Sequence, residues 1–250
     1  MNKKPHHSKL PNAPLQEVIF ELLWEIGRDE KGFPFDEEFN FAKGVFADIT
    51  KHDFPFRKNT LLDTTQIRFY PVPVHQFWKA ENTWPVLQIG HGMLVVNDIE
   101  ANYTWDNYKN LIHQAIDFLL KSRQKELFFF TARLKYIDAY EIGDVNKLKF
   151  INENIKLTLQ NHFISNVDVV TLNVNQTFKL EHDNFLEVVL STGLSPDNKP
   201  ALIWQSTVYN EGKMNREQLI NWLENAHEIA SKHFKQFINR ELYDKFTQNK

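Results

Sequence analysis

Hydrophobic and polar residues alternate in the first part of the chain that has a regular pattern. Within Leu15 to Gly27, every second residue from Val18 onward is large and apolar, and glutamates occur at positions between them. A repeat of two residues is typical of a strand that buries one face. We therefore expect a half-buried β-strand over residues 15–27.

Several later segments also have the pattern of strands. Short strands are expected at Gln66–Tyr70 and Val74–Lys79, and Pro85–Asn97 predicts a hairpin whose turn contains Gly90, His91 and Gly92. Glycine favours such a turn because it accepts positive φ angles. Four further strands are expected in the second half of the chain, at Leu127–Ile142, Val167–Leu180, Phe185–Thr192 and Ala201–Asn210.

Amphipathic stretches with helical spacing lie between these strands. We expect a short helix over Asp36–Ile49 and a long one over Thr104–Lys121, with Thr104 as its N-cap. A second long helix should begin after Asn215, because Asn215 and Gln218 have the spacing of a capping box. The predicted fold class is therefore α+β, with an antiparallel β-sheet, or more than one, packed against two long amphipathic helices.

The segments also predict how the chain is divided. Residues 1–11 are expected to form a disordered tail, and residues 12–250 a single compact α+β domain. An alternative is two similar halves of sheet plus helix, residues 15–121 and 126–250. The connector between those halves is short and charged, which favours the single domain.

Composition narrows the possible environments and partners. The 250 residues are 42% hydrophobic, which is enough to build a full core, and the net charge of -3 gives no overall attraction to nucleic acid. The absence of cysteine excludes disulfides and thiolate metal sites and fits a reducing compartment. No apolar run approaches the roughly 20 residues of a membrane helix. We expect a cytoplasmic protein with neither a membrane span nor a nucleic-acid partner.

Motifs for catalysis or cofactor binding are absent from the sequence. The eight glycines form no phosphate-binding loop, and no GxSxG nucleophile motif occurs. His227 and Glu228 lack a second histidine at the spacing of a zinc-protease helix, because His233 lies six residues away. We therefore predict no cofactor and no metal.

The segment Arg133–Ile142 holds the most informative polar residue. Strand alternation places Asp138 on the same face as Tyr136 and other large apolar residues. A buried aspartate must be paired or hydrogen-bonded, so Asp138 is a candidate pocket residue with Arg68 or Arg133 as its partner. The alternative is a structural salt bridge inside the protein, or a strand end near solvent.

Two other residues complete the predicted ligand-binding set. His91 stands between two glycines at a hairpin tip, where it is either a ligand contact or an ordinary turn residue. Trp204 lies in a predicted strand and, with Tyr136 and Asp138, would line an aromatic pocket beneath the C-terminal helix.

Four parts of the chain together resemble a known sequence family. They are APLQEVIFELLW (Ala13–Trp24), LQIGHGMLVVND with YTWDNY (Leu87–Asp98 and Tyr103–Tyr108), RLKYIDAYE (Arg133–Glu141) and AHEIASKHFKQFINRELYDKF (Ala226–Phe246). This set resembles a sporadically distributed family of bacterial proteins that has no established activity. The chain departs from the family where Lys135 replaces the usual arginine and Asp138 the usual asparagine. The family's patchy occurrence implies horizontally exchanged genes, including those of anti-phage defence loci.

Three functional hypotheses follow. The first is a non-catalytic recognition or adaptor protein of a mobile or defence locus, which acts with a protein partner or self-associates. The second is a small-ligand-binding domain with the aromatic pocket near Asp138, Tyr136 and Trp204. The third is a hydrolase that uses aspartate and histidine residues from separate strands, such as Asp138 and His91.

Overall fold

The computed structural model describes most of the chain, in five stretches: residues 10–60, 71–99, 103–160, 168–195 and 197–248. The described part has a large antiparallel sheet and α-helices, so the predicted α+β class is confirmed. The residues group into two discontinuous units. The first unit comprises Met1–Glu17, Lys135–Val208 and Asn225–Lys250, and the second unit comprises Val18–Leu134 and Tyr209–Glu224.

These units do not follow the predicted halves at 15–121 and 126–250. Four elements have residues in both units: the strands Leu15–Trp24, Phe129–Glu141 and Pro200–Asn210, and the helix Arg216–Phe237. The single domain of residues 12–250 and the two similar halves both remain predictions.

The strands of the second unit follow the order β4-β5-β6-β7-β1-β8. Their bounds are β1 (Leu15–Trp24), β4 (Phe56–Asn59), β5 (His75–Trp78), β6 (Val86–Gly90), β7 (Met93–Ile99) and β8 (Phe129–Glu141). From β4 to β7, each strand pairs antiparallel with the next. A separate small ribbon joins β2 (Gly27–Arg28) to β3 (Pro34–Phe35). The predicted strand at Gln66–Tyr70 lies outside the described residues.

The predicted hairpin at Pro85–Asn97 is confirmed as β6 and β7, but its two glycines have different roles. Gly92 has a positive φ of 66°, as the sequence predicts. Gly90 is needed for another reason, because a Cβ atom there would lie 2.1 Å from the carbonyl oxygen of Val72. The role of Gly90 depends on the close approach of backbone from a distant segment, which no local sequence pattern reveals.

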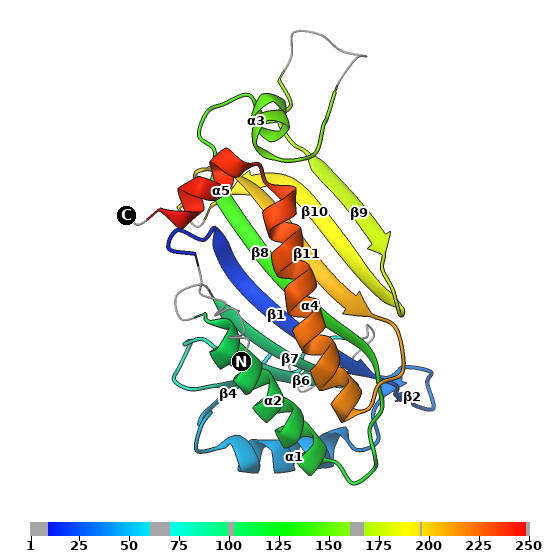
Figure 1. Ribbon diagram of the computed structural model, residues 1–250. Helices are drawn as coiled ribbons and strands as arrows, with labels where there is room; N and C mark the ends of the chain where they lie inside the picture. Colours follow the sequence, from blue (N-terminus) through cyan, green and yellow to red (C-terminus); the bar gives the residue numbers. More distant parts are fainter. Residues whose placement is uncertain (1–9, 61–70, 100–102, 161–167, 196, 249–250) are drawn as a thin grey trace, which may run out of the picture. The chain divides into compact units, whose positions relative to one another are not determined.

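Helices α1 (Phe39–Thr50) and α2 (Trp105–Ser122) lie side by side in the second unit (Figure 1). The side chain of Thr104 caps α2 by accepting a hydrogen bond from the backbone N–H of Asn107, as predicted. Tyr108 anchors α2 to the sheet, because its buried hydroxyl donates to the carbonyl of Val96 at 2.7 Å. Phe46 of α1 packs against Phe77 of β5.

The strands of the first unit follow the order β8-β11-β10-β9. The further strands are β9 (Asn173–Lys179), β10 (Asn184–Leu194) and β11 (Pro200–Asn210). The N–H of Ile142, just past β8, donates to the carbonyl of Pro200 at 3.0 Å. This bond places the end of β8 beside the start of β11.

Three helices complete the described part of the C-terminal region, α3 (Lys147–Asn154), α4 (Arg216–Phe237) and α5 (Arg240–Thr247). The predicted capping box of α4 is confirmed, since Asn215 and Gln218 each bond the other's backbone N–H. The segment Ala226–Phe246 is divided between two helices. Asn239 ends the first because its side chain caps α5 at Leu242 and its N–H bonds the carbonyl of Asn154.

In Figure 1 the C-terminal part of α4 lies across β8 and β11 of the first unit. A core cluster joins these strands to α3 and α5, and its buried members are Ile142, Ile151, Ile155, Leu190, Leu202, Trp204, Ile238, Leu242 and Phe246. Leu10, within the predicted tail, packs against this cluster. Residues 1–9 lie outside the described residues. Within the described stretches, no helix is long and apolar enough to cross a membrane.

We predict opposite effects for two Gly→Ala substitutions in the second unit. Gly90→Ala should lower the free energy of unfolding by about 1–3 kcal/mol, because its methyl group meets the Val72 backbone. Gly44→Ala adds a methyl group to α1 where no atom lies within 4 Å, and should raise that free energy by about 0.5–1 kcal/mol. Urea denaturation measures both, and equal effects would contradict the close approach at Gly90.

Candidate functional site

A buried ion-pair cluster joins α2 to the segment before α1 in the second unit. Arg123 contacts both carboxylate oxygens of Asp36, at 2.6 and 2.9 Å, and its Nε lies 3.0 Å from Glu38 without the alignment of a hydrogen bond. Burial alone would raise the pKa of Asp36, but the hydrogen bonds and charge of Arg123 outweigh it and hold that pKa below its usual value. The cluster is therefore a paired, charged structural contact.

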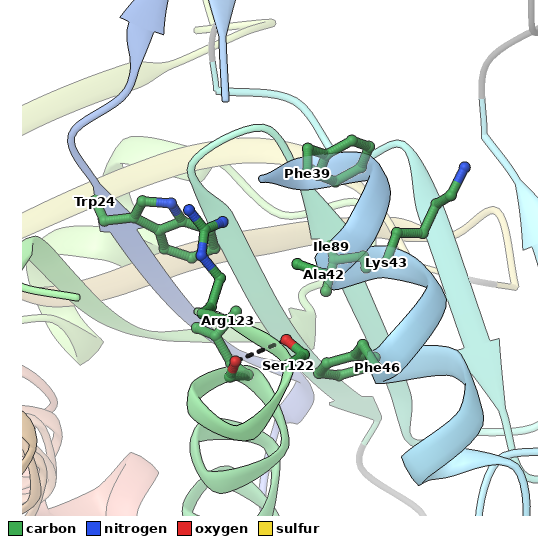
Figure 2. Close-up of a pocket in the computed structure, with 10 residues that line it drawn as sticks. Trp24, Phe39, Ala42, Lys43, Phe46, Ile89, Ser122 and Arg123 are labelled. Atoms are coloured by element: carbon green, nitrogen blue, oxygen red, sulfur yellow. Dashed lines mark hydrogen bonds between the residues drawn. The ribbon is translucent and has the colours of Figure 1, made fainter. Parts of the chain in front are cut away.

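Figure 2 shows the surroundings of this cluster, with the guanidinium of Arg123 alongside the ring of Trp24. The cavity there has a volume of about 10 Å³, which is close to the least that holds one water molecule. His91 belongs to the same structural group, because its Nδ1 accepts a hydrogen bond from the Asp36 N–H and its ring stacks on Phe39 at 4.2 Å. Burial lowers the pKa of His91. These contacts give His91 a packing role.

The two predicted arginine partners of Asp138 are placed differently. Arg133 forms an ion pair with Glu21 at 3.5 Å and lies 6.0 Å from the ring of Tyr209, all within the second unit. Arg68 lies outside the described residues. The polar neighbour that the structure provides for Asp138 is the indole of Trp204.

The other three predicted residues do come together, in the first unit. Tyr136 and Asp138 share one face of β8, and the indole of Trp204 on β11 lies next to the Asp138 carboxyl group. Asp138 is 5% exposed and Trp204 is fully buried. The ring centroids of Trp204 and Phe234 in α4 lie 6.3 Å apart, and an aromatic pocket at this position stays a prediction.

Burial raises the pKa of Asp138 to about 7. The Trp204 indole lowers this pKa somewhat, although its N–H lacks the geometry of a full hydrogen bond. A carboxyl group with this pKa is about half protonated at neutral pH and largely protonated at lower pH, and in its protonated form it costs much less to bury than a carboxylate. Asp138 is thus a neutral interior group below its pKa.

Two histidines of α4 continue this polar row beneath the helix. The hydroxyl of Tyr136 lies 2.8 Å from Nδ1 of His227, and the hydroxyl of Ser206 lies 3.2 Å from Nδ1 of His233. Burial lowers the pKa of His233. The sequence excludes a zinc-protease helix for these histidines and places His233 in the buried stripe of the helix, but it does not predict the contacts with Tyr136 and Ser206. The signal that could have found them is the apolar stripe of α4, in which His233 occupies a core-facing position.

A groove opens beside this row, between α4 and the turn that joins β9 to β10. We call it the α4 groove, and its volume is about 880 Å³. The lining residues are Lys179, Leu180, Glu181, His182, Asn184, Leu186, Asn225, Ile229, Lys232, His233 and Gln236. His233 therefore connects the groove to buried Ser206. Of the predicted ligand-binding residues that the structure describes, none lines the α4 groove.

The arrangement separates two kinds of chemistry. Asp138 and Ser206, which could donate or accept protons, are 5% and 3% exposed, whereas the groove presents ammonium, imidazole and amide groups and one carboxylate to solvent. Within the described ranges, no three histidine, cysteine, aspartate or glutamate side chains are placed to hold a metal ion. The groove is therefore the candidate site, and its groups are suited to binding.

Comparisons with protein-family models, with curated proteins and with solved structures found no match to the chain.

Replacing Asp138 should change how stability depends on pH. Because the folded-state pKa of about 7 is above the usual value of 3.8, the folded state keeps a proton that the unfolded state releases between these values. The free energy of unfolding should therefore fall by about 4 kcal/mol as pH rises through this window. Asp138→Asn removes this loss. The free energy of unfolding of the variant, relative to that of the original protein, should therefore rise between pH 4 and pH 8, as measured by denaturant titrations.

Exposed Asp144 provides the control for this experiment, because Asp144→Asn makes the same chemical change at the surface of the first unit. It should shift stability by less than about 0.5 kcal/mol at either pH. If stability depended on pH in the same way for Asp138→Asn and for the original protein, the pKa of Asp138 would not be raised by burial in the folded state.

Proposed function

We propose that the protein is a non-catalytic recognition protein that binds a small ligand in the α4 groove. The observation that carries this proposal is the groove itself, whose volume of about 880 Å³ falls within the range of small-molecule sites. Its lining combines apolar side chains, such as Leu186 and Ile229, with several groups that can donate hydrogen bonds.

The packing around the groove supports binding over catalysis. The buried hydroxyl of Ser206 contacts the His233 ring, and the contact between Tyr136 and His227 also fixes α4 on its strands. A wall that is held in this way is preorganised, which reduces the entropy lost when a ligand binds. Asp138, whose pKa burial raises to about 7, is in the interior rather than in the groove. We therefore place the ligand in this open, polar site rather than in the aromatic pocket expected near Trp204.

Native mass spectrometry of the protein isolated gently from its own host tests the proposal. We expect a small non-covalent mass in addition to the 29.6 kDa chain. Ile229→Trp should remove this mass, because the larger ring fills the groove. Glu228→Trp is the matched control, since Glu228 is the exposed neighbour on α4 and does not line the groove. A bare chain in all three preparations would contradict ligand binding.

A second candidate function is that of an adaptor with a protein partner, and the edge strand β9 favours it. Among the described strands, β9 ends the sheet, and six of its seven residues are exposed. Leu180 N–H donates to Asn184 and Thr192 N–H to Leu172, so the even-numbered residues of β9 bond β10. Asn175 and Thr177 then direct their N–H groups outward, where an extended partner segment could add as a strand.

Proline substitution tests this edge without breaking the sheet. Thr177→Pro removes an outward N–H and leaves the bonds to β10 intact, so a protein partner that pairs with β9 should be lost. Thr177→Ala removes the side chain but keeps the N–H, and should retain the partner. Affinity purification from the original host, followed by mass spectrometry, compares the variants. A partner that survives Thr177→Pro does not bind through β9.

A further inference from the structure

The walls of the α4 groove carry positive charge from two different elements. Lys179 ends β9 on one side, and Lys232 lies on α4 on the other. Glu181 is the acid among the lining residues, and its side chain is 94% exposed, so water and salt screen its charge. Lys179 and Lys232 are exposed as well, so screening weakens all three charges, and two ammonium groups against one carboxylate leave a net positive charge along the lining.

The remaining lining of the groove suits a molecule that is not wholly polar. Leu186 of β10 and Ile229 of α4 provide apolar surface from the same two walls as the lysines. Asn225 adds an exposed amide group that can donate to an anion or to polar atoms near it, whereas the Asn184 amide donates to the carbonyl of Glu181 at 2.8 Å. A charged group near the lysines with an apolar body over the leucine and isoleucine would use both parts of the lining.

The turn at the rim of the groove provides an independent observation. Asn184 N–H donates to the carbonyl of Glu181 at 3.2 Å, so these residues enclose a two-residue turn of His182 and Asp183. Both central residues have positive φ, 55° and 57°. This geometry strongly favours Asn-Gly or Gly-Gly, and side chains such as these cost free energy there. The His182 side chain is 89% exposed at this rim, and its Nδ1 lies 4.0 Å from the Glu181 carboxylate.

We infer that the α4 groove binds a small organic anion, a phosphate or carboxylate group on an apolar body, with Lys179, Lys232 and His182 around the charged group. This inference rests on the proposed function, because it names the class of ligand for the same groove. The lysines provide the charge, His182 provides a further donor, and the apolar wall distinguishes an organic anion from a free inorganic one.

Binding measurements with simple probes test the charge requirement. We would titrate the protein with phenyl phosphate, benzoate, inorganic phosphate and neutral benzyl alcohol, using calorimetry or NMR. Phenyl phosphate or benzoate should bind more tightly than the other two probes. The double variant Lys179→Gln with Lys232→Gln should raise the dissociation constant of that probe about tenfold or more. Lys235→Gln, an exposed lysine on α4 outside the groove, should change it less than about twofold.

Two turn variants test the role of His182. Asp183→Gly relieves one strained position and keeps the histidine, so it should raise the thermal midpoint of unfolding and retain binding. His182→Asn combined with Asp183→Gly creates the favoured turn sequence. This pair should raise the midpoint at least as much, but should weaken binding of the organic anion several-fold. Unchanged affinity for the organic anion in His182→Asn with Asp183→Gly would overturn the role of His182.

The outcomes separate this inference from the proposed function. If benzyl alcohol binds as tightly as phenyl phosphate and Ile229→Trp abolishes both, the groove binds ligands but the anionic class is wrong. Equal binding of inorganic and phenyl phosphate would refute the apolar body. If no probe binds the original protein, the inference fails, and the native mass measurement with Ile229→Trp decides the broader proposal by itself.

Discussion

The position of α4 over β8 and β11 is the constraint on which the rest of the first unit depends. A helix can cover this face only if the polar side chains beneath it are paired or neutral, because an unpaired buried polar group costs free energy. Tyr136 and Ser206 meet this condition through the histidines of α4, and Asp138 meets it by remaining protonated up to a pKa of about 7. With α4 fixed in this way, its outer flank forms one wall of the α4 groove.

Burial therefore divides the polar residues of this unit by role. Asp138 and Trp204 are the residues that a search for pocket chemistry selects first, yet they are packed inside. The groups available to a ligand lie on the flank of α4 and at the hairpin turn, including Lys232 and His182. His233 belongs to both sets, since it lines the groove and contacts Ser206. Interior residues thus position the wall, and surface residues contact the ligand.

Local signals in the sequence predicted the elements that depend on local physics. The alternation in β1 and the capping box at Asn215 are both present, because strand periodicity and helix capping need only neighbouring residues. The role of Gly90 and the contacts of Asp138 depend on segments distant in the chain, which a single sequence does not specify. The groove was missed for the same reason. The pair His182 and Asp183 also lacks the glycine or asparagine that usually identifies a two-residue hairpin turn.

A crystal structure of the protein purified gently from its own host is the most direct measurement of whether the α4 groove is a binding site. We expect continuous density for one small molecule in the groove, with its charged group near Lys179 and Lys232 and its apolar part against Ile229. A well-ordered groove that contains only water, or that is filled by another part of the chain, would contradict ligand binding at this site.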